Sequence, residues 1–196
     1  MCSLRRNEQV EERAVKDYGI IRPLLEDRYA AVQAVSGDTP RIQQLLLKTA
    51  KWLQSRGSSQ WSGLLRGEDS HRTPEAVERG DVFLFKNGED VAAMVMLLRK
   101  PSEWDIELWG EADSDRAVYV HRLAIDRDYA GQRLGGSVLQ WVSEGIRFIG
   151  KDRIRLDCIA SNGALNALYQ TMGYTYVGES TNSDGSFSKF EKRLTV

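Results

Sequence analysis

The sequence contains few residues of the kinds that hold small proteins together by disulfides or metal ions. Its 196 residues include two cysteines and two histidines. Cys2 and Cys158 are too few for a disulfide framework, and neither belongs to a C-x-x-C motif, so we expect no zinc or thiol redox site. His71 and His121 lie far apart in the sequence and form no ligand cluster. We therefore expect a reduced, cytoplasmic protein without a bound metal.

The sequence also lacks an excess of one charge and any long apolar segment. It has 27 Lys and Arg against 28 Asp and Glu, which gives a formal net charge of −1. A dedicated nucleic-acid binder usually carries a basic domain, so we expect no nucleic-acid partner. No apolar run approaches the ~18 residues of a membrane-spanning helix. The N-terminal segment is charged where a signal peptide would be apolar, and we expect no membrane partner.

The length of the chain suits one domain with a short extension. Residues 1–27 are rich in charge, and opposite charges four residues apart, such as Glu12 and Lys16, are compatible with a solvated helix. We assign residues 1–27 to a helical or flexible N-terminal extension and residues 28–196 to a single folded domain.

Apolar periodicity predicts the order of strands and helices in this domain. Strands are predicted at Tyr29–Val35, Asp81–Lys86, Val91–Arg99, Val118–Ile125, Arg153–Cys158, Thr175–Gly178 and Phe187–Leu194. Helices are predicted between Asp38 and Gly57, from Thr73, at Ser137–Phe148 and at Leu165–Met172. Asn87-Gly88 is a strong hairpin signal between two of the strands. The pattern indicates an α/β (α+β) fold with a mixed central sheet flanked by helices.

A glycine-containing turn joins the strand that ends at Ile125 to the helix that follows. Backbone N–H groups in such a turn, together with the positive end of the helix, form a site for phosphate or pyrophosphate. The glycines do not have the spacing of a Walker loop or of the G-x-G-x-x-G fingerprint. Considered alone, the segment is either a phosphate cradle or a structural turn.

Two longer stretches resolve this choice by their resemblance to a known family. The segments HRLAIDRDYAGQRLGGSVLQWV and LDCIASNGALNALYQTMGYTYVGES resemble the GNAT superfamily of acyl-CoA-dependent N-acetyltransferases. The first is similar to the strand, pyrophosphate loop and helix of that family. The second contains Asn162, Tyr169 and Gly173-Tyr174 at positions similar to the family's motif. The resemblance implies a GNAT-like, mostly antiparallel central sheet and acetyl-CoA as co-substrate.

The resemblance also implies which residues bind the cofactor. The backbone of Leu123, Ala124 and Ile125 would pair with the pantetheine arm, and Asn162 would hydrogen-bond to it or simply cap its helix. Backbone amides of the loop would hold the pyrophosphate, from Gly131, Gln132, Arg133, Leu134, Gly135, Gly136 and Ser137. The loop departs from the family pattern, because Ala130 replaces the usual Arg or Gln and Arg133 replaces the usual middle Gly. Arg127 and Arg133 either reach a CoA phosphate or are solvated.

The resemblance implies that Tyr169 is the general acid beside the cofactor sulfur, where a phenol can donate a proton to the leaving thiolate. His121, two residues before the cofactor-binding strand segment, is either the base for the attacking amine or a packed histidine. The acidic run Glu103–Asp115 either attracts a cationic amine, supplies the base, or forms a solvated loop. Trp61, Trp104 and Trp109 either line the acceptor pocket or belong to the core. Cys158 has no evident partner base and is a poor candidate for a nucleophile.

The sequence therefore predicts an N-acetyltransferase that moves an acetyl group from acetyl-CoA to a primary amine by direct attack in a ternary complex. The acceptor is a small molecule or a peptide, and a homodimer is compatible with the resemblance. Two alternatives stay open: a non-catalytic acyl-CoA-binding regulatory module of the same fold, and a nucleotide-binding α/β protein that uses the same loop.

Overall fold

The computed structural model of the chain describes residues 17–194. Most of the predicted N-terminal extension, including Glu12 and Lys16, lies outside these residues. The described part of the extension contains β1 (Tyr18–Ile20) and β2 (Leu24–Leu25). β1 pairs with β7 (Ile146–Phe148), and β2 pairs with β3 (Tyr29–Gln33). Residues 18–25 are thus integrated with the domain that follows.

The centre of the fold is an eight-stranded sheet in the order β2-β3-β4-β5-β6-β8-β10-β9. All its neighbouring strands are antiparallel except β6 and β8, which are parallel. Its other strands are β3 (Tyr29–Gln33), β4 (Val82–Asn87), β5 (Asp90–Leu98), β6 (Ala117–Ile125), β8 (Arg153–Ile159), β9 (Thr175–Asn182) and β10 (Gly185–Arg193). The predicted mixed, mostly antiparallel sheet is confirmed.

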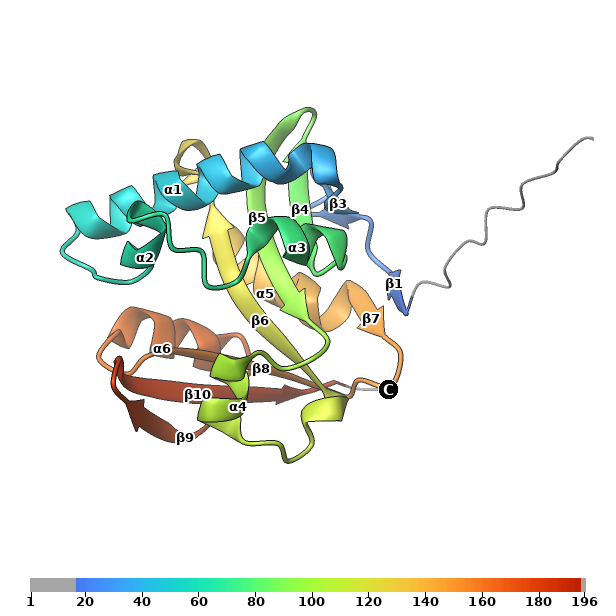
Figure 1. Ribbon diagram of the computed structural model, residues 1–196. Coiled ribbons are helices and arrows are strands. Elements are labelled where there is room, and N and C mark those ends of the chain that lie inside the picture. The colour runs from blue at the N-terminus through green and yellow to red at the C-terminus, as the bar shows by residue number, and fades with distance from the viewer. Residues whose placement is uncertain (1–16, 195–196) are drawn as a thin grey trace, which may run out of the picture.

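Helices cover both faces of this sheet (Figure 1). On one face, here called the front, lie α1 (Thr39–Ser55), α2 (Ser62–Leu65), α3 (Thr73–Glu78) and α4 (Glu103–Trp109). The back face carries α5 (Leu134–Glu144) and α6 (Gly163–Thr171). The front core packs α1 residues such as Ile42 and Leu46 on Leu84 and Met94 of the sheet. The larger back core includes Trp141 of α5.

The helix predicted at Ser137–Phe148 is wrong at both ends. It starts three residues earlier, at Leu134, and stops at Glu144, while residues Ile146–Phe148 form β7 and pair with β1. A Cβ atom on Gly145 would lie 2.3 Å from the indole of Trp141, so a glycine is required where the helix ends. Ile146 fits the helical apolar period but belongs to the strand.

The C-terminal strands are longer than predicted. The loop expected at Thr181–Ser186 is a tight turn between β9, which reaches Asn182, and β10, which begins at Gly185. The full length of these strands could not be predicted from apolar periodicity, because β9 is the edge of the sheet, is mostly exposed and has a polar composition.

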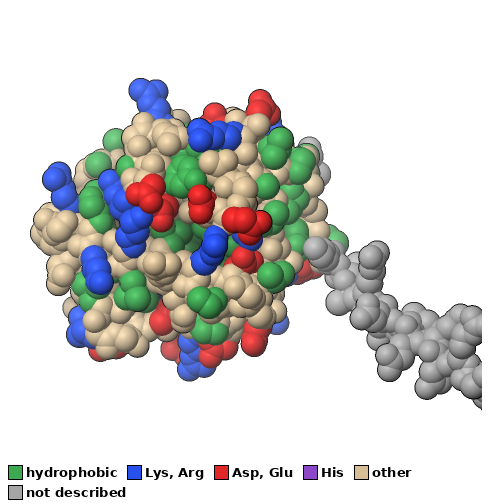
Figure 2. All heavy atoms as spheres, turned by 90° about the horizontal axis from the view of Figure 1, so that it is seen from above, with side chains coloured by type: hydrophobic (Ala, Val, Ile, Leu, Met, Phe, Trp, Pro, Cys, Tyr) green, Lys and Arg blue, Asp and Glu red, His purple; other side chains and the backbone are tan. Residues whose placement is uncertain are grey.

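The surface distribution of charge agrees with the balanced composition. The face above α1 carries acidic and basic side chains interspersed (Figure 2). Within residues 17–194, no helix has both the length and the apolar content needed to cross a membrane.

Candidate active site

The two parallel strands at the middle of the sheet separate from each other. β6 and β8 pair only over Ala117–Tyr119 and Arg153–Arg155. Beyond these residues, β6 continues to Ile125 and β8 to Ile159 without pairing to one another. The edge of β6 at Leu123, Ala124 and Ile125 therefore faces an opening, where an extended ligand can pair with backbone groups as an added strand.

A β-bulge interrupts β6 where it separates from β8. His121 pairs with Met96 and Ala124 pairs with Met94, so β6 uses one residue more than β5 over this interval. Arg122 has a positive φ of 48° and takes up the extra residue. A bulge turns two consecutive side chains to the same face. His121 and Arg122 both contact front-face residues, which alternation in a regular strand would prevent.

The loop before α5 presents a row of free backbone donors. Within the described residues, no backbone or side-chain acceptor is found for the N–H groups of Gly131, Gln132, Arg133, Leu134 and Gly135. These amides lie at the N-terminus of α5, where the helix dipole adds positive potential. The loop thus has the donors that a pyrophosphate requires.

The structure explains how the loop accommodates its departure from the family pattern. Arg133 adopts a φ of 57°, the left-handed conformation for which glycine is favoured, and its side chain is exposed. Gly131 also has a positive φ, of 80°. Gln132 accepts a 2.7 Å hydrogen bond from the Tyr29 hydroxyl, which ties the loop to β3.

Other predicted cofactor residues have structural partners of their own. The Leu134 side chain is buried in the back core. The Ser137 hydroxyl donates to Glu26. Gly136 lies close to α6, since a Cβ there would be 3.4 Å from the Met172 sulfur. Asn162 accepts from the Leu165 N–H at 3.1 Å and caps α6, so the capping interpretation is confirmed.

His121 forms a buried pair with an aspartate of α4. Its Nε2 lies 2.9 and 3.1 Å from the two carboxylate oxygens of Asp105, whose side chain is 1% exposed. Burial opposes ionisation of Asp105, but hydrogen bonds from His121 and Ser102 hold its pKa below the usual value. A carboxylate only accepts, so Nε2 carries the proton and Nδ1 of the neutral ring keeps its lone pair. This arrangement is that of an oriented base.

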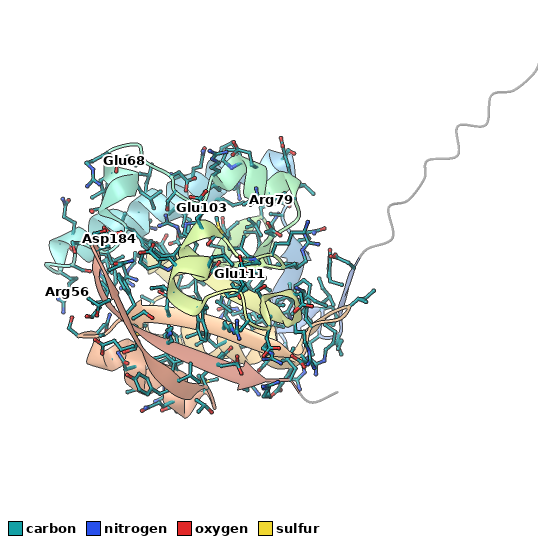
Figure 3. All side chains as sticks on the ribbon, turned by 60° about the horizontal axis from the view of Figure 1, so that its bottom comes forward. Arg56, Glu68, Arg79, Glu103, Glu111 and Asp184 are labelled. Atoms are coloured by element: carbon teal, nitrogen blue, oxygen red, sulfur yellow. The ribbon has the colours of Figure 1, made fainter. Side chains whose placement is uncertain are left out.

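The acidic run is therefore neither a loop nor wholly solvated. Ser102 and Asp105 form a capping box that starts α4, with the Ser102 hydroxyl accepting from the Asp105 N–H at 3.2 Å. The prediction of a solvated loop is wrong for this helix, and Asp105 is directed at the sheet. Glu103 and Glu111 are exposed, and Figure 3 places them on α4 and just after it.

A second aspartate lies on the front face of β8. Asp157 accepts a 3.3 Å hydrogen bond from the Trp104 indole N–H. Burial raises the pKa of Asp157 and the charge of Asp105 adds to this effect, while His121 opposes it. Two carboxylates and one imidazole thus share the front side of the strand separation.

Tyr169 of α6 approaches from the back face. Its ring packs on Phe190 at 5.4 Å and Tyr174 at 6.3 Å between centroids, and its hydroxyl has no hydrogen-bond partner within the described residues. Burial raises its pKa, and the negative charge of Asp157 acts in the same direction. The phenol is protonated at neutral pH and can act as a donor.

Cys158 is not an activated nucleophile, and Arg127 packs against a tryptophan. Burial and the charge of Asp157 raise the pKa of Cys158 to about 12, so this thiol is protonated and a weak nucleophile. The Arg127 guanidinium stacks on Trp52, 4.1 Å from the ring centroid. Trp109 packs with Tyr119, whereas the Trp61 ring lies against the Arg122 guanidinium and the Trp104 indole N–H donates to Asp157.

The sequence analysis did not single out several polar residues that lie around His121 on the front face. They are Ser70, His71, Asp105, Arg122 and Asp157. The Ser-x-x-Asp spacing at residues 102–105 is a helix-start signal that could have identified Asp105 as oriented. His71 carries no local signal, since only the fold brings its ring to 4.7 Å from that of His121. No group of three or more His, Cys, Asp or Glu side chains suited to a metal ion occurs within residues 17–194.

Comparison with known proteins gives a consistent result. Residues 46–174 match the acetyltransferase (GNAT) family. A Bacillus subtilis (strain 168) protein described as "Uncharacterized N-acetyltransferase YesJ" is 48% identical over 172 residues, 88% of this chain and 94% of that protein. A GNAT-family acetyltransferase structure from Listeria monocytogenes is 31% identical, with a TM-score of 0.67 over 85% of this chain and 95% of that one. The structure of yncA from Salmonella typhimurium with its cofactor acetyl-CoA shares the fold at 13% identity, with a TM-score of 0.60 over 85% and 94% of the two chains.

Proposed function

Because the chain belongs to the GNAT family of acetyltransferases and is an N-acetyltransferase, we propose that it moves an acetyl group from acetyl-CoA to a primary amine by direct attack in a ternary complex. The observation that carries the proposal is the His121–Asp105 pair, buried at the point where β6 leaves β8. The acceptor is a small-molecule or peptide amine, and the compartment is the cytoplasm. The proposed assembly is a homodimer.

The chain's own groups fit the proposed co-substrate. The free amides of residues 131–135 at the start of α5 would bind the pyrophosphate. The open edge of β6 at Leu123–Ile125 would pair with the pantetheine arm, and the amide group of Asn162 would reach it from the start of α6. When bound, acetyl-CoA supplies an activated acetyl group as a thioester.

His121 is proposed as the base on the front face. An amine attacks only when it is neutral, so a proton must leave its nitrogen. The lone pair on His121 Nδ1 would accept that proton, directly or through one water, while Asp105 stabilises the resulting imidazolium. The bond formed is between the amine nitrogen and the acetyl carbon.

Tyr169 is proposed as the acid on the back face. The bond broken is the thioester C–S bond, and the departing sulfur takes a proton from the phenol. The raised pKa of Tyr169 keeps that proton in place before the reaction. The base and the acid approach the strand separation from opposite faces of the sheet, so one ligand group passing between β6 and β8 can meet both.

The test is thiol release from acetyl-CoA with a panel of primary amines, together with calorimetry using CoA, ATP and NAD. Saturation kinetics in both substrates with intersecting reciprocal plots would support a ternary complex. Tight CoA binding without turnover of any amine would favour the non-catalytic module. Preference for ATP or NAD over CoA would favour the nucleotide-binding alternative.

A further inference from the structure

The bulge in β6 brings a buried arginine to the same face as the proposed base. Arg122 is 8% exposed, and its Nε and Nη1 have no hydrogen-bond partner in the described structure. Only its Nη2 donates, to the Ser70 hydroxyl at 3.3 Å. Leaving buried N–H groups of a charged side chain unpaired is costly, and such groups are rarely found without a function.

No carboxylate within residues 17–194 satisfies these donors. Asp69 is the acidic group whose charge acts on Arg122. Its two oxygens accept instead from the backbone N–H groups of His71 at 3.3 Å and Thr73 at 2.7 Å. The Trp61 ring lies over the Arg122 guanidinium at 5.0 Å, which leaves the in-plane N–H groups available to a ligand.

His71 contributes a further unpaired donor. Its Nδ1 lies 3.1 Å from the Ser70 hydroxyl, and its buried Nε2 has no partner within the described residues. Burial, with the positive charge of Arg122 acting in the same direction, lowers the pKa of His71 to about 3, so the ring is neutral. The Ser70 oxygen accepts from Arg122 and has a second lone pair, so its contact with Nδ1 fits either tautomer of His71. The site proposed below uses the tautomer in which Ser70 donates to Nδ1 and Nε2 carries the ring proton.

We propose that Arg122 and His71 form a subsite for the carboxylate of the acceptor, so that the substrate is an amine that also carries a carboxylate, as an amino acid does. This inference rests on the proposed function, because His121 is the base that receives the amine. Three nitrogen atoms with unpaired N–H groups, two on Arg122 and one on His71, favour an anion over a neutral group.

The short distances in the cluster favour an amine and a carboxylate on one small molecule. His121 and Arg122 are consecutive residues, so their Cα atoms are about 3.8 Å apart. The ring of His71 lies 4.7 Å from that of His121. The proposed base and the His71 ring thus lie close together on the front face, and Arg122 is next to the base in the chain, which suits an amine and a carboxylate held a few bonds apart.

The residues that shield Arg122 from solvent belong to a segment with little regular structure. Trp61 and Ser70 both lie between α1 and α3, where the only helix is the four-residue α2. The donors have almost no solvent contact, so this segment must move aside when a carboxylate enters. It lies on the same side of the molecule as the β9–β10 turn, marked by Asp184 in Figure 3.

The first test uses the unmodified enzyme and matched acceptors. Thiol release from acetyl-CoA is measured with each amino acid, its carboxamide and the corresponding decarboxylated amine. We expect kcat/KM to be roughly 10- to 100-fold higher for the acids than for the amides, the range of a hydrogen-bonded charge. Equal values for acids and amides would overturn the carboxylate subsite and leave the N-acetyltransferase function intact.

The second test uses Arg122→Gln, with Arg56→Gln as the matched control. Arg56 is exposed beyond the end of α1 and lies at the edge of the molecule in Figure 3. Arg122→Gln should reduce the acid-to-amide ratio to near one, mainly through KM for the acid, while Arg56→Gln keeps the ratio. An unchanged ratio in folded Arg122→Gln contradicts the proposal. Arg122→Lys, which keeps the charge, should give an intermediate ratio.

A binding measurement separates the two proposals if no amine turns over. N-acetylated amino acids and their amides are titrated by calorimetry into the protein saturated with CoA. Binding that requires the carboxylate and is lost in Arg122→Gln would support the anion subsite even without activity. Binding of neither compound, or of both equally, would refute it.

Discussion

Asp105→Asn tests the proposed base through the direction of one hydrogen bond. In the native site, Asp105 Oδ2 accepts from the Ser102 N–H at 2.8 Å and from its hydroxyl at 2.7 Å. An asparagine must therefore place its carbonyl oxygen at this position, because its NH2 group would face a backbone donor. The NH2 group then takes the position of Oδ1, which is 2.9 Å from His121 Nε2.

This orientation changes the tautomer of His121. The amide NH2 group, at the 2.9 Å position, is nearer to Nε2 than the carbonyl oxygen at the 3.1 Å position. We therefore expect the amide N–H to donate to Nε2, so that the ring proton moves to Nδ1 and the lone pair proposed to accept the amine proton is lost. General base catalysis contributes about 10²- to 10⁴-fold, and a wrong tautomer removes most of it. We expect kcat to fall by about 10²- to 10⁴-fold. The fold should persist, because both hydrogen bonds to Ser102 remain.

Stability provides an independent check on the same variant. Loss of a carboxylate at the start of α4 costs about 0.3–1 kcal/mol, which lowers Tm by a few degrees. The pKa of Asp105 is lowered in the folded protein, so its contribution is present above the unfolded pKa and is lost as pH falls through the folded pKa. The Tm difference between Asp105→Asn and the native protein should therefore vanish in acid.

The assay is thiol release with an accepted amine, with Glu103→Gln as the control for charge on the same helix. Glu103 is exposed two residues before Asp105 on α4 (Figure 3), and its variant should retain native kcat. Nitrogen NMR of the histidine rings reports the tautomer directly. Near-native kcat in Asp105→Asn with the proton on Nδ1 would refute the assignment of His121 as base.

Three further variants test other parts of the site. Tyr169→Phe should lower kcat by about 10²-fold in the thiol-release assay and leave CoA affinity unchanged by calorimetry; equal activity would remove Tyr169 from the mechanism. Asp157→Asn keeps the acceptor for Trp104 and removes an acid whose pKa burial raises. Its ionisation at neutral pH opposes folding, so the variant should raise Tm at pH 7 and have no effect near pH 3. Gly131→Ala has no steric neighbour but a φ of 80°, so it should cost about 1–2 kcal/mol in urea unfolding and weaken CoA binding; unchanged stability would show that the loop does not need this conformation.

The elements of the sheet were predictable because their residues alternate or cluster with few conflicts. β4 and β5 carry nearly continuous apolar residues around Asn87-Gly88, and both strands are buried in the structure. The end of α5 was not predictable from periodicity, since Ile146 continues the helical pattern. The end of this helix is determined by tertiary contacts, namely the Trp141 ring against Gly145 and the pairing of β7 with β1.

The proposed pyrophosphate loop could be predicted from the sequence because it is continuous. The loop and the start of α5 lie within residues 131–137, and their backbone N–H groups would do the binding. The acceptor side is assembled from four separate segments, which contribute His71, Asp105, His121 and Asp157. Nothing in the spacing of these residues relates them, and only the packing of α4 and the α1–α3 segment on the sheet brings them together.

One sequence signal does mark the acceptor side, and it lies in β6. The apolar residues that face the back core are Val118 and Val120, then Leu123 and Ile125. The interval between the two pairs is three residues instead of two, which a regular strand cannot satisfy, because it would turn Leu123 to the opposite face. The extra residue must be absorbed by a bulge, and the residue that absorbs it is Arg122. The extra residue in β6 thus keeps Leu123 and Ile125 in the back core and places the charged Arg122 on the same face as His121, the proposed base. The apolar pattern of one strand therefore specifies both the packing and the polar site.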